Sequence, residues 1–398
     1  MKNTFGSSVA ITLFGESHGR SIGAVLDGMA PGIPVDEEFI RHQMDLRRSL
    51  SALSTARREA DEVIIESGVF RGKTTGTPIC LRIENQQARS TDYDKTELLA
   101  RPGHADFTAH EKYHGYEDAH GGGHFSGRIT AGLVAAGAIA ISALREKGIL
   151  IGTHIAACGG VCDRPFGDLG ADIKALSSMP FAVLDSLAAE KMQAAIAAAK
   201  TEGDSVGGVL ESAVIGMPTG VGEPWFDTVE SLLSHILFSI PAVKGVEFGD
   251  GFALAAMRGS QANDPFRMQN GRVVTESNRA GGILGGITTG MPLHVRVAVK
   301  PTPSIYREQQ TVDLAAMKDA TLSIVGGMIP PSCTARAWWW IVPLRWRFAI
   351  CWRFASAPIG WPPARRQGHE IRLDWRKAGA QLLARDPCPP GRLHLRAV

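Results

Sequence analysis

The chain has 398 residues, of which 44% are hydrophobic and 21% charged, a composition that suits a globular protein with a substantial core. No stretch reaches the roughly 18 uninterrupted apolar residues that a membrane-spanning helix needs, and the first residues lack the apolar run of a signal peptide. We therefore expect a soluble, cytoplasmic protein. The net charge of +2 hides an asymmetry, since residues 1–330 hold 30 Lys+Arg and 37 Asp+Glu whereas residues 331–398 hold 12 and 3.

Short apolar runs between Gly and Pro residues predict strands in the first part of the chain, at 9–13, 22–26, 63–65 and 79–83. Helices are predicted at 37–50 and 187–200, and an Ala- and Gly-rich run predicts a buried helix at 129–144. The clearest amphipathic helix is expected at 227–240, with Asp227 as its N-cap and Pro241 after its end. Residues 246–248 and 252–257 are predicted to be strands.

The chain repeats part of itself. Gly72-Lys-Thr-Thr-Gly-Thr-Pro-Ile79 matches Gly286-Ile-Thr-Thr-Gly-Met-Pro-Leu293, and a strand-like run follows each. Asp27-Gly-Met-Ala-Pro-Gly-Ile-Pro34 is loosely similar to Ile215-Gly-Met-Pro-Thr-Gly-Val-Gly222, and a predicted helix follows each. The repeat predicts two similar α+β halves around a pseudo-two-fold axis.

A glycine-rich segment, Gly121-Gly-Gly-His-Phe-Ser-Gly-Arg128, precedes the predicted buried helix. Consecutive backbone N–H groups at a helix start can bind a phosphate, although a plain flexible loop is the alternative. His18 and His104 lie on tight turns beside charged residues, where a fixed imidazole could give or take a proton near neutral pH. Each histidine alone is more often structural than catalytic.

One motif points to a different chemistry. His110-Glu-Lys-Tyr-His114 is a literal H-E-x-x-H, the spacing that places two zinc ligands and a general base on one helical face. Gly103 and Gly115 bracket it, and no apolar stripe extends the helix. A zinc metallohydrolase using His110, Glu111 and His114 is the alternative function, and a nucleic-acid binder using the basic tail is a second one.

Taken together, segments in order along residues 5–326 resemble the chorismate synthase family. The segments that carry the resemblance are 14–19, 67–70, 74–79, 101–106, 121–128, 134–140, 244–252, 276–290 and 300–305. Single motifs among them are weak, but the ordered set is specific. The family usually has Arg-Ser-Ser-Ala-Arg where this chain has His-Phe-Ser-Gly-Arg, and Pro-Gly where it has Ser49-Leu50.

The resemblance implies a carbon–oxygen lyase of the shikimate pathway. Members of the family convert 5-enolpyruvylshikimate 3-phosphate to chorismate by a 1,4-anti elimination of phosphate and a ring hydrogen, with reduced FMN and no net redox change. It also implies residue roles. His18 and His104 match the acid–base histidines, and Arg47 or Arg48 matches an arginine that binds substrate or NADP. The expected FMN contacts are His124, Phe125, Ser126, Gly285, Lys300, Pro301, Thr302, Pro303 and Ser304. No metal is implied, and NADPH or a separate reductase could reduce the flavin.

The resemblance also implies an α+β fold in which antiparallel sheets sandwich helices. We expect one catalytic domain over residues 1–326, with similar halves at about 1–145 and 205–326. The family is usually homotetrameric, and we expect a small-molecule substrate with no nucleic-acid or membrane partner.

The last segment, residues 327–398, departs from the family. After Val325-Gly326 the family continues Gly-Arg-His-Asp-Pro and an apolar helix, whereas this chain reads Gly326-Gly-Met-Ile-Pro330, and seven of its eight Trp lie in 338–375. A single base lost after Gly326 accounts for this, because the codons of residues 327–330, read one base over, can encode Arg-His-Asp-Pro. We expect a disordered Arg/Trp-rich tail and impaired activity.

Overall fold

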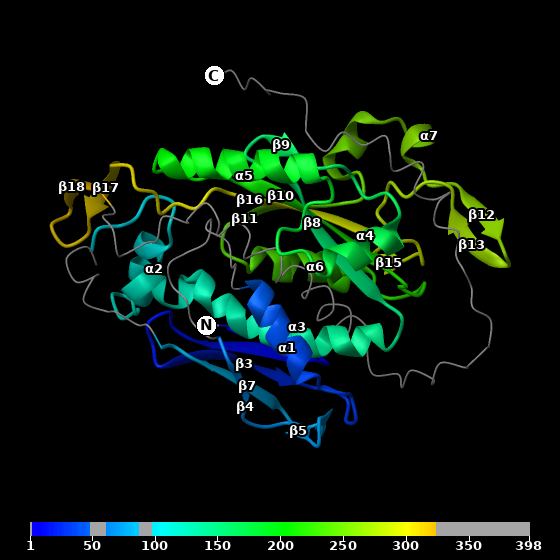
Figure 1. The fold of residues 1–398 in the computed structure, drawn as a ribbon, viewed down its shortest axis with the longest axis horizontal. Coiled ribbons are helices and arrows are strands. Elements are labelled where there is room, and N and C mark those ends of the chain that lie inside the picture. The colour runs from blue at the N-terminus through cyan, green and yellow to red at the C-terminus, as the bar shows by residue number, and fades with distance from the viewer. Residues whose placement is uncertain (1, 48–60, 87–97, 324–398) are drawn as a thin grey trace.

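The computed structural model describes residues 2–47, 61–86 and 98–323. Within them, two five-stranded antiparallel sheets lie on either side of a layer of helices (Figure 1). The first sheet has the order β1 (Thr4–Phe5), β2 (Ala10–Gly15), β3 (Ser21–Asp27), β7 (Ile79–Glu84), β4 (Val63–Ile65). The second has the order β11 (Val243–Phe248), β16 (Leu293–Val299), β10 (Gly208–Ile215), β8 (Leu150–Cys158), β9 (Val161–Cys162). The predicted antiparallel α+β sandwich is thus present.

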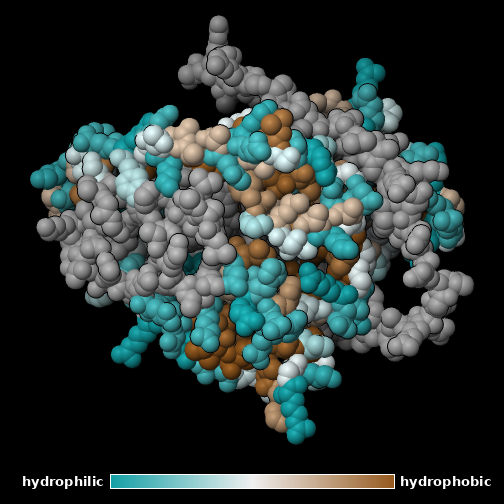
Figure 2. Space-filling view, viewed as in Figure 1, coloured by the Kyte–Doolittle hydropathy of each residue, from teal (hydrophilic) through white to brown (hydrophobic). Residues whose placement is uncertain are grey.

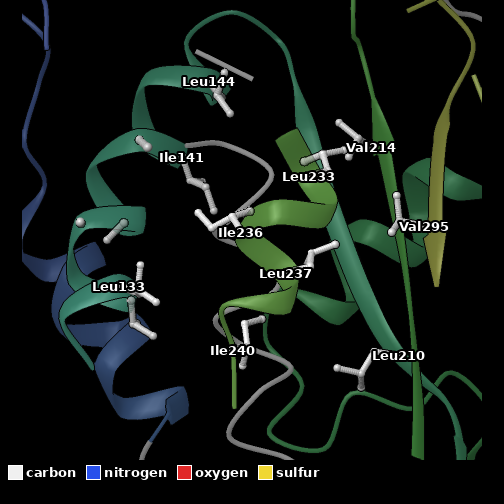
Figure 3. Packing of buried hydrophobic residues seen from close by; sticks show 14 of the residues in the cluster. Leu133, Ile141, Leu144, Leu210, Val214, Leu233, Ile236, Leu237, Ile240 and Val295 are labelled. Atoms are coloured by element: carbon white, nitrogen blue, oxygen red, sulfur yellow. The ribbon is translucent and has the colours of Figure 1, made fainter. Parts of the chain in front are cut away.

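The helix layer contains α1 (Glu37–Arg47), α3 (Thr130–Arg145) and α6 (Val229–Phe238). Figure 3 shows α3 beside α6, with Ile141 of α3 directed towards Ile236 of α6 and the second sheet lying beyond. The labelled side chains are buried, and burying a Leu or Ile side chain stabilises a fold by about 1.5–3 kcal/mol. The main hydrophobic core therefore lies in this layer and joins both sheets.

Helix α3 is the buried helix predicted from the Ala- and Gly-rich run. Gly132 permits its close approach to the first sheet, because a Cβ atom there would lie 2.7 Å from the backbone of Gly23 in β3. Among the described residues, 127–145 form a helix long and apolar enough to span a membrane, but most of it is buried inside the protein. Such burial is typical of a core helix.

Further helices and hairpins surround this sandwich. Helix α5 (Ser186–Thr201) lies beyond the second sheet, away from α3 (Figure 1), and α4 (Leu169–Leu176) packs Ile173 against Gly152 of β8. Both faces of β8 and β10 are consequently covered. The peripheral elements are β5 (Val69–Phe70), β6 (Lys73–Thr74), α2 (Asp106–Tyr113), α7 (Gly259–Ala262), β12 (Phe266–Gln269), β13 (Arg272–Thr275), β14 (Ile283–Leu284), β15 (Ile287–Thr288), β17 (Gln309–Asp313) and β18 (Lys318–Leu322).

The two sheets share a strand order. In the first, β2, β3, β7 and β4 are consecutive neighbours, and in the second β8, β10, β16 and β11 are. A short hairpin, β5–β6 or β14–β15, precedes β7 and β16 respectively.

The repeated motifs also make the same contacts in both halves. The hydroxyl of Thr74 donates to Ala30 O at 2.6 Å and accepts from Ile33 N at 2.9 Å. The hydroxyl of Thr288 donates to Pro218 O at 2.6 Å and accepts from Val221 N at 2.9 Å. Each threonine thus joins its glycine-rich turn to the hairpin in the same way.

Hydrophobic side chains also reach the surface. Figure 2 shows them gathered in several areas that hydrophilic residues border. One of these hydrophobic areas lies in the lower part of the view, over the first sheet. No described helix covers the outer face of that sheet (Figure 1). Trp225, Phe226 and Phe252 are each at least 85% exposed. Large exposed apolar areas are typical of contact surfaces between proteins.

Two sequence predictions need correction. The amphipathic helix begins after Thr228, whose hydroxyl accepts from Ser231 N at 3.0 Å, so Thr228 and not Asp227 is the N-cap. Residues 252–257 do not form a strand, because 251–256 are a 3₁₀ helix that begins at the left-handed Gly251 (φ 52°). The tail at 327–398 and the end of the 37–50 helix lie outside the described residues.

Candidate active site

Three consecutive glycines form a turn, Gly121–Gly123, at the N-terminal side of α3. Their φ angles are 61°, 86° and 50°, a left-handed backbone that side-chain-bearing residues rarely adopt. A Cβ atom on Gly121 would lie 2.1 Å from Cε1 of His18. One on Gly122 would lie 3.1 Å from Nε2 of His104. This glycine turn therefore contacts both predicted acid–base histidines and brings them to one place.

His18 lies on the turn between β2 and β3. Its Nδ1 donates to the carbonyl oxygen of His120 at 3.1 Å, just before the glycine turn. Asn85, at the end of β7, holds the turn from the other side: its Nδ2 donates to Glu16 O at 3.1 Å and Gly19 O at 2.7 Å. Because these carbonyls flank His18 in sequence, Asn85 fixes the backbone that carries the imidazole.

His104 lies on a turn that leads into α2. Its Nδ1 is 2.5 Å from Oδ1 of Asp106, the first residue of that helix. Arg101 forms a bidentate ion pair with the same carboxylate, with Nε and Nη2 each 2.7 Å from an oxygen. Burial opposes ionisation of Asp106, but the hydrogen bonds from Arg101 and His104 outweigh it and lower its pKa well below the usual range. A fixed negative charge thus lies behind His104.

Residues 300–304, which were predicted to contact FMN, extend from the second sheet to the turn that carries His104. The ammonium group of Lys300 donates to Gly103 O at 2.6 Å, and a Cβ on Gly103 would lie 3.2 Å from Pro303. Thr302 is held by Ser205, whose hydroxyl donates to Thr302 O at 2.8 Å. Ser304 is buried, and Pro301 is exposed. The segment therefore lies beside His104, as a shared site requires.

The three residues after the glycine turn have structural contacts of their own. His124 Nδ1 donates to Gly15 O at 2.8 Å, and the ring of Phe125 meets that of Tyr113 edge-on at 6.1 Å. The hydroxyl of Ser126 accepts from Arg128 N at 3.3 Å. These contacts connect the glycine turn with the His18 turn, α2 and the start of α3.

The two arginines predicted at the substrate or nucleotide end have different outcomes. Arg47 is only 3% exposed, and its Nη1 donates to Asp61 at 2.8 Å. Asp61 also pairs with Arg128, whose Nε donates to Asn85 Oδ1 at 3.0 Å. These contacts make Arg47 part of the support beneath the site, and direct ligand contact by it stays a prediction. Arg48 lies outside the described residues.

Gly285 is the FMN-contact candidate that this fold does not bring to the glycine turn. It lies at the exposed end of the β14–β15 hairpin with φ 61°. In Figure 1, β15 and α2 lie at opposite sides of the molecule. Its predicted role is therefore without geometric support within this chain.

The H-E-x-x-H motif does not form a zinc site. Helix α2 ends at Tyr113, and His114 is left-handed with φ 57°, so it does not continue the helical face of His110. His110 Nδ1 instead lies 3.1 Å from Oε1 of Glu117, and Glu111 is exposed. Across residues 2–47, 61–86 and 98–323, no cluster of three or more His, Cys, Asp or Glu residues could hold a metal.

Similarity to known proteins agrees with this geometry. The family model described as chorismate synthase matches residues 9–338. A chorismate synthase from Thermococcus kodakarensis is 46% identical over 321 residues, covering 81% of this chain and 89% of that relative. One from Pyrococcus abyssi is 47% identical over 332 residues, covering 83% and 92%. A solved structure, titled "Crystal Structure of Chorismate Synthase", aligns with a TM-score of 0.65 and 28% identity over 88% of this chain and 92% of that one.

The chain belongs to the chorismate synthase family. It is therefore a lyase by family, and nothing in the matches favours a zinc hydrolase. The family match extends 12 residues beyond the boundary predicted at 326, since it ends at 338.

Several supporting residues of this family site escaped the sequence reasoning. Asp61 and Asn85 belong to no motif that we singled out, and their partners are 40 or more residues away in sequence except for Arg47. Arg101 and Asp106 stand inside the quoted Arg101–Asp106 motif. A carboxylate two residues after a histidine at a helix start was the signal that could have identified Asp106.

Proposed function

We propose that this chain is a lyase of the chorismate synthase type, whose reaction is the 1,4-anti elimination of phosphate from 5-enolpyruvylshikimate 3-phosphate to chorismate with reduced FMN, and that its altered C-terminus impairs this activity. Family membership supports the reaction. The observation that carries the proposal is the glycine turn, where His18 approaches from the β2–β3 turn and His104 from the turn before α2. Two proton-transfer groups beside a common surface are what an elimination assisted by acids and bases needs.

The residues present fit a phosphate-bearing aromatic cofactor. The imidazoles of His18 and His104 occupy the positions that side chains on Gly121 and Gly122 would take, so the glycine turn holds two proton-transfer groups next to the segment assigned to the cofactor. Lys300 supplies a positive charge beside His104, and His124, Phe125 and Ser126 follow the turn directly. We assign FMN contacts to these residues and to 301–304, and we keep Gly285 as a predicted contact.

Reduced FMN, when bound, supplies electron density to the substrate transiently and takes up the departing ring hydrogen. The protein's own residues position the reactants and move protons. His18 protonates the leaving phosphate. His104 gives a proton to the flavin or takes one from it. Arg47 supports the site through Asp61, and Arg48 is the candidate for contact with substrate or NADPH. Whether NADPH or a separate reductase reduces the flavin is left open by these residues.

Replacing the histidines tests the proposal. We predict that His18→Ala and His104→Ala each lower kcat about 10²- to 10⁴-fold, the usual contribution of a general acid or base. Chorismate formation would be measured without oxygen and with chemically reduced FMN, with each substitution made in a version of the chain whose reading frame is restored after Gly326. His42→Ala is a matched control on the exposed side of α1 and should keep the parent rate. Parent-like rates in both site variants would rule out the assigned roles.

We extend the proposal to the whole assembly. The shared strand order and the matching threonine contacts support two halves related by a pseudo-two-fold axis, within one catalytic domain over 1–326. The outer face of the first sheet, which no described helix covers, supports a homotetramer, as is usual in the family. A cytoplasmic location without membrane or nucleic-acid partners is part of the same proposal.

The C-terminal change belongs to the proposal as well. The family's Arg and Asp after residue 326 are absent from this sequence, and both are expected at the flavin and catalytic centre. We attribute this to a reading-frame shift in the codon after Gly326. Resequencing the DNA at this codon tests the hypothesis. A gene that encodes residues 327–398 as given, with close relatives that encode the same segment, would exclude a lost base.

A further inference from the structure

We propose that Asp106 is a positioning residue for the lyase reaction: it holds the proton of neutral His104 on Nδ1 and so presents Nε2 to the glycine turn. The inference rests on the acid–base role proposed for His104. It adds a residue to which the family resemblance assigned no role.

The geometry of the carboxylate carries the argument. Oδ1 of Asp106 lies 2.5 Å from His104 Nδ1 and 2.7 Å from Arg101 Nη2. Oδ2 accepts from Arg101 Nε at 2.7 Å and from the backbone N of Arg101 at 3.0 Å. Both oxygens are thus fixed by N–H groups, and Asp106 is 17% exposed in its side chain. The carboxylate has little freedom to rotate away from the imidazole.

The position of the proton follows from this arrangement. An ionised carboxylate can only accept hydrogen bonds. Arg101 stabilises that ionised form, consistent with the lowered pKa of Asp106. The hydrogen between Asp106 and His104 therefore belongs to Nδ1. A histidine whose Nδ1 is a donor must use Nε2 as its acceptor when neutral.

The edge of the ring that carries Nε2 and Cε1 faces the glycine turn. A Cβ on Gly122 would lie 3.1 Å from Nε2 and 3.0 Å from Cε1 of His104. The charged groups that face this imidazole are Arg101, Asp106 and, through Gly103, Lys300. Asp106 contacts Nδ1 and not Nε2, so it orients the ring without occupying the proposed reactive atom.

The wild-type chain allows a direct test. The ¹⁵N spectrum of histidine-labelled 398-residue protein, assigned with His104→Gln, reports which ring nitrogen carries the proton. At a pH where His104 is neutral, we expect Nδ1 to give the protonated-type signal and Nε2 the unprotonated type. The reverse assignment in folded wild-type protein would overturn the proposal without any variant of Asp106.

Asp106→Asn tests the cause. The position of Oδ2 faces two obligatory donors of Arg101, so the amide oxygen should occupy it and the NH₂ group should face His104. Nδ1 must then accept, and the proton should move to Nε2. We expect this tautomer switch, with kcat lowered about 10²-fold or more and KM within about threefold. A parent-like tautomer in the folded variant would also overturn the proposal.

Glu117→Gln is the matched control, because it alters another histidine–carboxylate pair of this region, His110 with Glu117 at 3.1 Å. It should leave the His104 spectrum and kcat unchanged. Asp106→Glu should retain the Nδ1 proton and recover part of the rate. The spectra decide the role of Asp106 even if the chain makes no chorismate. A tautomer switch that leaves kcat at the parent value would instead count against the proposed function of His104.

Discussion

Gly121 lies so close to His18 that a methyl group would enter the space of the imidazole ring. Its backbone is left-handed, and a Cβ atom on it would lie only 2.1 Å from Cε1 of His18. The residue therefore has both a conformational and a steric reason to be glycine. The same turn meets His104 one residue later. Single glycines thus determine where two catalytic candidates can lie.

Gly121→Ala should therefore displace His18. We predict a loss of lyase activity of about 10²-fold, the effect expected when a reacting group moves by about 1 Å. Steady-state kinetics with reduced FMN would measure it.

Gly148→Ala is the control for backbone strain. Gly148 has φ 75°, and a Cβ there would meet nothing within 4 Å. It should cost about 1–2 kcal/mol of stability, the strain of a side-chain-bearing residue in the left-handed region, and leave activity unchanged. Equal activity losses in the two variants would mean that strain, and not the contact with His18, explains the effect at Gly121.

At the residue level, the sequence singled out candidates whose motifs are local, and their catalytic roles stay predictions. His18 and His104 were identified from their own motifs, and both lie at the glycine turn. Asp61 and Asn85 were not, because their importance comes from contacts such as Asn85 with Arg128, 43 positions away. No sequence pattern encodes that a buried carboxylate will lie between two particular arginines.

At the scale of elements, a buried ionic cluster joins the strands of the second sheet. His154 of β8 lies 2.7 Å from Asp163 and 2.9 Å from Glu211 of β10, and all three side chains are at most 8% exposed. Burial opposes the charge on His154, but the hydrogen bonds to the two carboxylates outweigh it and raise its pKa. Burial likewise opposes ionisation of Glu211, but His154 lowers its pKa to about 2.

Glu211→Gln should destabilise the protein in a pH-dependent way. Removing one partner of a buried ion pair costs about 3–5 kcal/mol, and we expect this loss near pH 6. The ionised Glu211 side chain adds to the free energy of unfolding above the ordinary Glu pKa of 4.5, and this contribution is lost as pH falls through its folded-state pKa of about 2. Denaturant unfolding of the wild type and of Glu211→Gln would be measured between pH 6 and pH 2. The difference between their free energies of unfolding should become smaller as the pH falls.

Ser212→Ala provides the comparison at the neighbouring position. Its hydroxyl pairs with Thr153 at 2.8 Å across the same two strands. Loss of this neutral hydrogen bond should cost about 1 kcal/mol without the same dependence on pH. A difference between wild type and Glu211→Gln that stays constant down to pH 2 would show that His154 and Glu211 are not charged partners.

The same cluster explains why prediction of elements was incomplete. The strands at β2, β3, β4 and β7 were predicted because apolar runs stand between turn residues. Strands β8 and β10 were missed, since both faces are covered and polar residues such as His154 and Glu211 interrupt their apolar pattern. These residues are acceptable in a buried sheet only because the partner strand satisfies them. The strand predicted at residues 252–257 was wrong for the opposite reason, because this apolar run is largely exposed and forms a 3₁₀ helix instead.

At the scale of the whole molecule, the relation between two halves that the internal sequence repeat indicates stays a prediction. The repeat predicted two similar halves, and the sheets share their strand order from β2–β3–β7–β4 to β8–β10–β16–β11. In the first half, α3 follows β7 and fills the layer between the sheets. The family's apolar helix would follow the second half in the same way, after residue 326. The altered tail therefore replaces an element that the repeat leads us to expect.

The most direct test is chorismate formation by two proteins, the 398-residue chain and a version with the reading frame restored after Gly326. Both would receive 5-enolpyruvylshikimate 3-phosphate and chemically reduced FMN without oxygen. We predict that the restored protein forms chorismate and that the 398-residue chain forms little or none. Absence of product from a folded, restored protein would contradict the proposed function, and robust production by the 398-residue chain would contradict the role given to its C-terminal change.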